Sequence, residues 1–162
     1  MSRSIVLSAV ATTTDLKPSP ICADWILAGK PEARSKLLAK SRDGTSYVVV
    51  WECSAGQFEW HYVEDETVTV TSGEVFISTE PGKELRLGQG DMAFFPAGSS
   101  CEWSVPDRVR KVAVMRKSLG YPLGFGVRAW YKLLSIAGLT DQSPLAPAAP
   151  SEKGRERFDA AA

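Results

Sequence analysis

Histidine is almost missing from this chain of 162 residues, which contains a single one, His61. A metal centre built from several histidines, or a mechanism with two catalytic histidines, is therefore excluded. The three cysteines, Cys22, Cys53 and Cys101, are an odd number without a CxxC pair. They indicate neither a disulfide framework nor a zinc knuckle, and reduced thiols favour a cytoplasmic protein.

The chain also lacks an excess of charge, because 19 Lys and Arg residues balance 19 Asp and Glu residues. A broad nucleic-acid-binding surface needs more Lys and Arg, so nucleic acid is not an expected partner. No segment approaches the roughly 20 apolar residues of a membrane span. The apolar stretch Ile5–Ala11 follows only one basic residue, Arg3, and is a poor match to a signal peptide.

What the chain has is a composition of 44% hydrophobic and 23% charged residues, typical of one globular domain with a real core. From Ile21 to Lys117, short β-branched and aromatic segments alternate with Gly and Pro turns. We expect separate strands at Tyr47–Cys53, Phe58–Tyr62, Glu66–Thr71, Glu74–Ser78, Cys101–Val105 and Val109–Val114. Such closely spaced strands, without intervening helices, predict an all-β sandwich or barrel.

The flanking segments differ from this β region. An N-terminal arm is predicted because Lys17-Pro18-Ser19-Pro20 disfavours helix. A C-terminal extension with one helix is predicted from an apolar stripe at helical spacing. The stripe consists of Trp130, Leu133, Leu134 and Ala137. We expect it to dock on the protein's own barrel or on a second subunit, and we expect no membrane binding.

The predicted organisation thus has four parts. They are the N-terminal arm at residues 1–20, the barrel at 21–117, the C-terminal extension at 118–139 and a disordered tail at 140–162. The tail is predicted to be disordered because it is rich in Pro, Ala and charge.

Strand alternation predicts which side chains face the interior. Phe58, Trp60 and Tyr62 share one face, which should be the inner one, so His61 points outward. Glu66 shares a face with two valines, an unusual position for a carboxylate because burying an unpaired charge is costly. Cys101 and Trp103 share the inner face of a later strand. The predicted ligand-binding residues are therefore Trp60, Tyr62, Glu66, Cys101 and Trp103.

Each of these residues also has a purely structural interpretation. The two tryptophans can be core residues, and Cys101 can be a small, inert hydrophobic residue. Tyr62 can hydrogen-bond to a backbone carbonyl group. Glu66 can be a site residue or the partner in a structural ion pair, and at the start of its strand it can reach solvent.

The spacing of these residues resembles the two motifs of the cupin barrel family. Glu66 is followed by six residues and Gly73, which matches the end of the first motif. Gly90, five residues, Pro96-Ala97-Gly98, two residues and Cys101 match the second motif, with Cys in the place of its histidine. Trp60 and Tyr62 stand at the two histidine positions of the first motif, whereas the spacing from Gly56 departs from the pattern.

Residues 47–114 are most similar to the ureidoglycine aminohydrolase cupin subfamily. The similarity runs through Trp51–Trp60, Asp65-Glu66, Ser72–Val75 and the segment from Gly90 onward. This resemblance implies a single small antiparallel jelly-roll barrel, often dimeric, with the site inside it. The aminohydrolase itself looks like two fused cupin barrels, with manganese held in one of them by His, Glu and Gln ligands, and it releases ammonia from ureidoglycine. Of those ligand positions this chain keeps only Glu66, so we do not expect a strong metal site.

Three functions compete. We favour a cupin that binds a small nitrogenous or hydroxylated metabolite inside the barrel, as a cytoplasmic homodimer. The first alternative is a metal-assisted, aminohydrolase-like enzyme. It would use Glu66 as catalytic base or ligand and hold Mn, Fe, Ni or Zn with Tyr62 and Cys101. The second alternative is an accessory protein that docks a partner through the stripe around Trp130.

Overall fold

The computed structural model describes residues 8–80 and 83–117, together with residues 125, 126, 129, 130, 132, 133 and 136. The chain forms two compact units, Met1–Ser118 and Leu119–Ala162. In the second unit the described residues are helical; those at 129, 130, 132, 133 and 136 lie within or next to the predicted apolar stripe, whereas Phe125 and Gly126 precede it. The predicted tail at 140–162 lies outside the described residues. Within the described part of the chain, no helix has the length and apolar character needed to cross a membrane.

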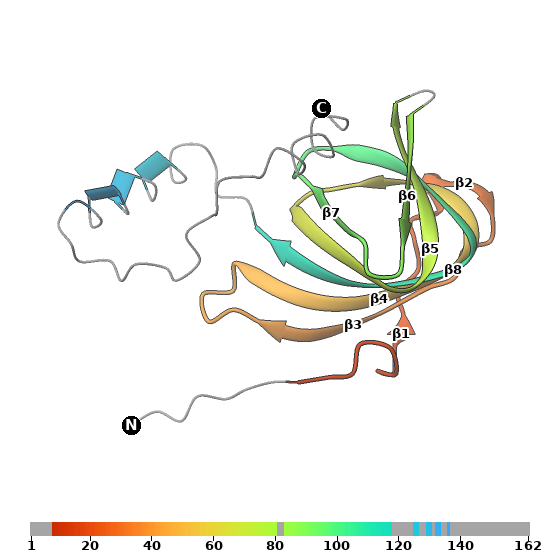
Figure 1. The fold of residues 1–162 in the computed structure, drawn as a ribbon, viewed down its shortest axis with the longest axis horizontal. Coiled ribbons are helices and arrows are strands. Elements are labelled where there is room, and N and C mark those ends of the chain that lie inside the picture. The colour runs from red at the N-terminus through yellow and green to blue at the C-terminus, as the bar shows by residue number, and fades with distance from the viewer. Residues whose placement is uncertain are drawn as a thin grey trace. The chain divides into compact units, whose positions relative to one another are not determined.

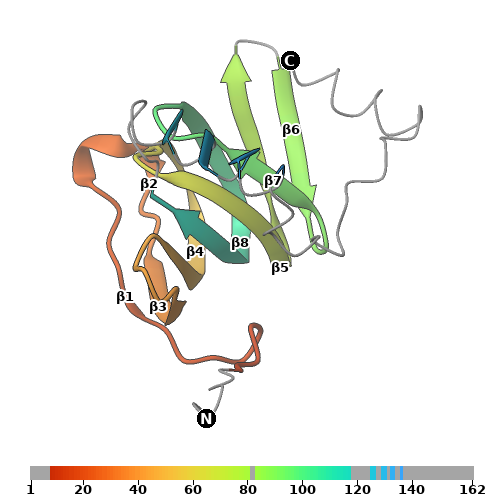
Figure 2. The same cartoon turned by 90° about the vertical axis from the view of Figure 1, so that its left-hand side faces the viewer.

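The first unit is a rolled antiparallel sheet with one short 3-10 helix (Figures 1 and 2). Its elements are β1 (Lys17–Pro18), η1 (Ala23–Trp25), β2 (Ile26–Gly29), β3 (Ala33–Lys40), β4 (Ser46–His61), β5 (Asp65–Glu80), β6 (Lys83–Gly88), β7 (Met92–Phe95) and β8 (Ser100–Arg116). The sheet order is β1-β3-β4-β8-β5-β6, while β2 pairs with β4 and β7 pairs with β5. The predicted all-β fold is confirmed.

The long strands β4, β5 and β8 curve around a common interior, as Figure 1 shows. Each of them joins two segments that we predicted as separate strands, so the predicted strand ends were wrong. The pairing register shifts between Ser54 and Gly56 on β4, and around Gly73 on β5. These glycines therefore mark β-bulges that bend a continuous strand, since bulges raise the local twist without ending the ladder.

Gly73 shows why one of these bulges requires glycine. Its φ is +73°, a region that L side chains rarely adopt. A Cβ atom at this position would also lie 1.8 Å from the carbonyl oxygen of Arg108 on β8. The close approach of the two backbones holds β5 against the bulged part of β8.

The N-terminal arm is tied to the sheet where it is described. Lys17 and Pro18 pair with β3 as strand β1. The Arg110 guanidinium, on β8 and almost fully buried, donates to the backbone oxygens of Ala11 and Thr14. It also donates to Glu52 on β4, so one arginine joins the arm to the sheet.

Candidate functional site

The five predicted site residues come together in the interior of the barrel. Tyr62, Glu66, Cys101 and Trp103 are each no more than 5% exposed, and the half-buried Trp60 packs against the same core. Each comes from β4, from β8, from the start of β5 or from the residue that follows β4. Their faces agree with the alternation of the sequence, and His61 is exposed as predicted.

Glu66 forms a buried ion pair with a residue that we did not predict, Lys111. Lys111 Nζ donates to Glu66 Oε1 over 2.7 Å, and the two side chains are only 4% and 3% exposed. Of the two interpretations of Glu66, the structure shows the ion-pair partner. Glu66 faces inward, as strand alternation predicts, and its side chain is only 3% exposed, so the carboxylate does not use the possible route to solvent at the start of its strand.

The register explains how the two charges meet. Glu66 lies opposite Met115 of β8, whereas Lys111 lies opposite Val70, four residues further along β5. The lysine side chain therefore runs along the inner face of the barrel, past the level of Ala113, to reach the carboxylate. The small side chain of Ala113 leaves room at the level between the two charged residues.

Three indole rings surround the Lys111 ammonium. Nζ lies 4.3 Å from the ring centroid of Trp103, 4.8 Å from that of Trp51 and 5.8 Å from that of Trp60. Indole faces attract cations, and more strongly where water is excluded. The ammonium is thus stabilised by one carboxylate and by the surrounding aromatic faces.

Tyr62 and Cys101 complete the polar interior. The Trp103 indole donates to the Tyr62 hydroxyl over 3.0 Å, and that hydroxyl lies 3.6 Å from Cys101 Sγ. The partner of Tyr62 is thus an indole and a thiol, not the backbone carbonyl of our structural alternative. Burial, the largest cause in each case, raises the pKa of Tyr62 far above 10 and raises the pKa of Cys101 above 9. Both groups are therefore protonated near neutral pH.

This donor set does not fit a metal ion. Metal-binding carboxylates and thiols must be free and deprotonated, but Glu66 is paired with Lys111 and Cys101 is a thiol. Trp60, at a histidine position of the cupin motif, has no lone pair to offer. No cluster of three or more His, Cys, Asp or Glu residues suited to a metal occurs within residues 8–80 and 83–117 or the described positions beyond them.

A pocket of about 380 Å³ opens beside β3 and β4. Its lining residues are Ser35, Leu37, Lys40, Gly44, Tyr47, Val49, Glu64 and Lys117. Tyr47 and Val49 share a face of β4 with Trp51, so alternation directs them toward the interior. The Tyr47 hydroxyl donates to Glu64 Oε2. Burial first, then this hydrogen bond and the charges of Glu64 and Glu66, raise the pKa of Tyr47 to about 12.

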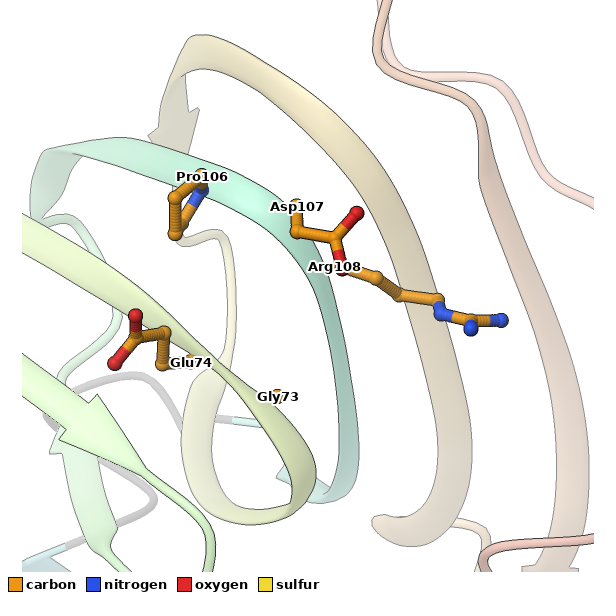
Figure 3. Close-up of a pocket in the computed structure, with 5 residues that line it drawn as sticks. All are labelled: Gly73, Glu74, Pro106, Asp107 and Arg108. Atoms are coloured by element: carbon orange, nitrogen blue, oxygen red, sulfur yellow. The ribbon is translucent and has the colours of Figure 1, made fainter.

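A second groove, of about 320 Å³, lies at the bulges of β5 and β8 (Figure 3). Gly73, Glu74, Pro106, Asp107 and Arg108 line it. Figure 3 shows the Arg108 side chain directed away from Glu74. None of the five predicted site residues lines this groove.

Our sequence reasoning missed Lys111, Trp51, Tyr47 and Glu64. For Lys111 a signal was present, because Val109, Lys111 and Ala113 alternate on one face. A lysine between two small apolar residues of a strand is as unusual as Glu66 between valines. For Tyr47 and Glu64 no comparable pattern exists, because Glu64 lies between strands.

Residues 40–113 match the family model of the EutQ-like cupin domain, a range that includes all five predicted site residues and Lys111. No curated protein gave a significant match.

Among solved structures, a protein of unknown function from Pseudomonas syringae pv. tomato, of the DUF861 family, is 26% identical with a TM-score of 0.59. The match covers 64% of this chain and 45% of that protein, so the chain spans less than half of its length. A putative ethanolamine utilization protein Q from Salmonella typhimurium is 27% identical over 54% of this chain and 72% of its own, with a TM-score of 0.48. A cupin-like protein from Thermotoga maritima is 15% identical, with a TM-score of 0.50. That match covers 61% of this chain and 77% of the Thermotoga protein.

The family match agrees with the cupin motifs, and the structures from Pseudomonas syringae and Thermotoga maritima agree with the rolled antiparallel sheet. The aminohydrolase subfamily is a finer assignment that they do not show, and it stays a prediction. Residues 40–113 thus resemble a EutQ-like cupin domain, and the first unit has a small all-β cupin fold.

Proposed function

We propose that this cupin binds a small nitrogenous or hydroxylated metabolite in the pocket beside β3 and β4, without a metal ion. The observation that carries the proposal is the pocket of about 380 Å³, in which the hydrogen-bonded Tyr47 and Glu64 lie beside apolar Leu37 and Val49. In small-molecule sites a few polar groups orient the ligand while apolar side chains contact the rest of it.

The pocket chemistry defines the class of ligand. The Glu64 carboxylate accepts hydrogen bonds from an amine, a ureido group or a hydroxyl group. Leu37 and Val49 offer apolar contact, while Lys40 and Lys117 at the lining favour a ligand that also carries negative charge. An amino or ureido carboxylic acid satisfies all three features.

The buried ion pair speaks against the enzyme alternative in which Glu66 acts as a general base. A base must reach the proton that it removes, and Glu66 is nearly fully buried and bonded to Lys111. The accessory-protein alternative has one favourable observation, since Trp130 and Leu133 are about 60% exposed in the second unit. A homodimer and a cytoplasmic location stay predictions from the sequence.

Calorimetric titration with N-carbamoylglycine, glycine and ethanolamine tests the proposal. We expect N-carbamoylglycine to bind best, and Glu64→Gln to weaken its binding by about tenfold, because a charge-assisted hydrogen bond is lost. Glu74→Gln, in the other groove, is the matched control and should bind like the wild type. Equal binding by all three proteins, or equal loss in both variants, would refute the assignment of this pocket.

A further inference from the structure

The surroundings of the Lys111 ammonium form a complete recognition site for a cation. One carboxylate oxygen lies 2.7 Å from Nζ, and the centroids of Trp103 and Trp51 lie within 5 Å of it. Within the described residues, no buried polar side-chain atom lacks a hydrogen-bond partner. A carboxylate beside aromatic faces is the arrangement that binds organic ammonium groups.

The same arrangement is poorly suited to a metal ion. Its aromatic members offer π faces and no lone pairs, whereas divalent metals need several oxygen, nitrogen or sulfur donors at short distance. The mismatch between this chain and metal-binding cupins is therefore more than a loss of histidines. Where those proteins hold a metal, this barrel has groups that suit an ammonium, and it supplies that ammonium from β8.

We propose that the centre of this barrel is an ammonium site occupied by the protein's own Lys111. Its ligand class is the primary alkylammonium ion, and the lysine acts as a covalently attached ligand. The interior then has its positive charge built in and is closed to external amines and to metals. This inference refines the proposed function, since it leaves the pocket beside β3 and β4, with Tyr47 and Glu64, as the place for a metabolite.

Chemical rescue tests the proposal directly. Lys111→Ala removes three methylene groups and the ammonium, and n-propylammonium contains the same three carbons and nitrogen. We expect n-propylammonium to raise the melting temperature of Lys111→Ala in a saturable manner. Neutral 1-propanol, which has the same size, should bind at least about tenfold more weakly, because it lacks the charge that the carboxylate and indoles recognise.

Two further variants serve as controls. Lys111→Met fills the space without a charge and should not respond to n-propylammonium. In the double variant Lys111→Ala/Glu66→Gln the preference for the ammonium over the alcohol should weaken, because only the indole rings remain to recognise the charge. If Lys111→Ala is unfolded by itself, restoration of its near-ultraviolet circular dichroism by n-propylammonium counts as binding.

Three results would overturn the proposal. An equal response to 1-propanol would show that only the cavity is being filled. Stabilisation of Lys111→Ala by Co²⁺ or Zn²⁺ in preference to n-propylammonium would show a metal site. A Lys111→Ala protein that n-propylammonium neither stabilises nor refolds would show that the site does not recognise an ammonium. None of these measurements involves the metabolite of the pocket beside β3 and β4, so failure here is distinct from failure of the proposed function.

Discussion

Replacement of Lys111 by methionine should cause a large, pH-dependent loss of stability. Methionine has a similar length and fits among the indole rings, so packing changes little. The Glu66 carboxylate, however, stays buried and loses its only cationic partner among the described residues. Breaking a buried ion pair on one side typically costs about 3–5 kcal/mol, because an uncompensated charge is left behind.

Protonation of the carboxylate sets an upper limit to this cost. An ordinary glutamate has a pKa of about 4.3, and each pH unit corresponds to about 1.36 kcal/mol. Folding with that group protonated therefore costs about 3.7 kcal/mol at pH 7, and about 1 kcal/mol at pH 5. A carboxyl group that is neutral in the folded state and charged in the unfolded state loses stability as pH rises. We expect the variant to be destabilised by about 3–4 kcal/mol at pH 7, and by much less at pH 5.

Urea unfolding, followed by tryptophan fluorescence at pH 5, 6 and 7, measures this dependence. The double variant Lys111→Met/Glu66→Leu should unfold close to the wild type at all three pH values, since neither charge remains buried. Arg86→Met removes an exposed ion pair with Glu74 and should cost less than about 1 kcal/mol. A loss below about 1 kcal/mol for Lys111→Met at pH 7, or an equal loss at pH 5, would contradict the reasoning.

Three further predictions follow from other parts of the structure. Gly73→Ala should lower the free energy of unfolding in urea by more than about 2 kcal/mol, because the new Cβ would collide with the Arg108 backbone. Gly90→Ala is the control: its Cβ meets open space, so the loss should be about 1 kcal/mol. In an absorbance titration, the phenol of Tyr47 should ionise near pH 12. Tyr47→Phe should therefore remove the absorbance change near pH 12 and leave the change near pH 10 as it is in the wild type. Arg110→Met removes the hydrogen bonds to the backbone of Ala11 and Thr14, so thermolysin should cleave the N-terminal arm several-fold faster while the rest of the sheet stays resistant. An unchanged cleavage rate would show that the arginine does not hold the arm.

The fold was predictable because local patterns and tertiary structure agree in the middle of the chain. Alternation between polar and apolar residues placed Phe58 and Trp103 inside, and both are no more than 1% exposed. The strand ends were not predictable in the same way. Glycine and proline interrupt alternation whether a strand stops or merely bulges, and at Gly56, Gly73 and Pro106 the ladder continues past the irregularity. Only pairing with a neighbouring strand distinguishes the two cases.

The candidate site was predictable to the extent that its residues lie on strands. Alternation brought Tyr62, Glu66 and Cys101 to one interior, and the structure places them there. It could not supply the partner of Glu66, because Lys111 reaches the carboxylate from four residues further along the paired strand. The contact depends on the length of the lysine side chain and on the small size of Ala113, which lies at the level between Lys111 and Glu66.

The internal ion pair has a consequence for how such a barrel can be used. A ligand amine that approached Glu66 would have to displace Lys111, and the ammonium would then lose its carboxylate while still surrounded by indole rings. That exchange leaves one buried charge unpaired, so it is unfavourable for any ligand that brings only a single cation. The Lys111–Glu66 pair therefore keeps the charges inside the barrel fixed and balanced. Selection among metabolites is left to groups that can still form new hydrogen bonds, such as Tyr47 and Glu64 in the pocket beside β3 and β4.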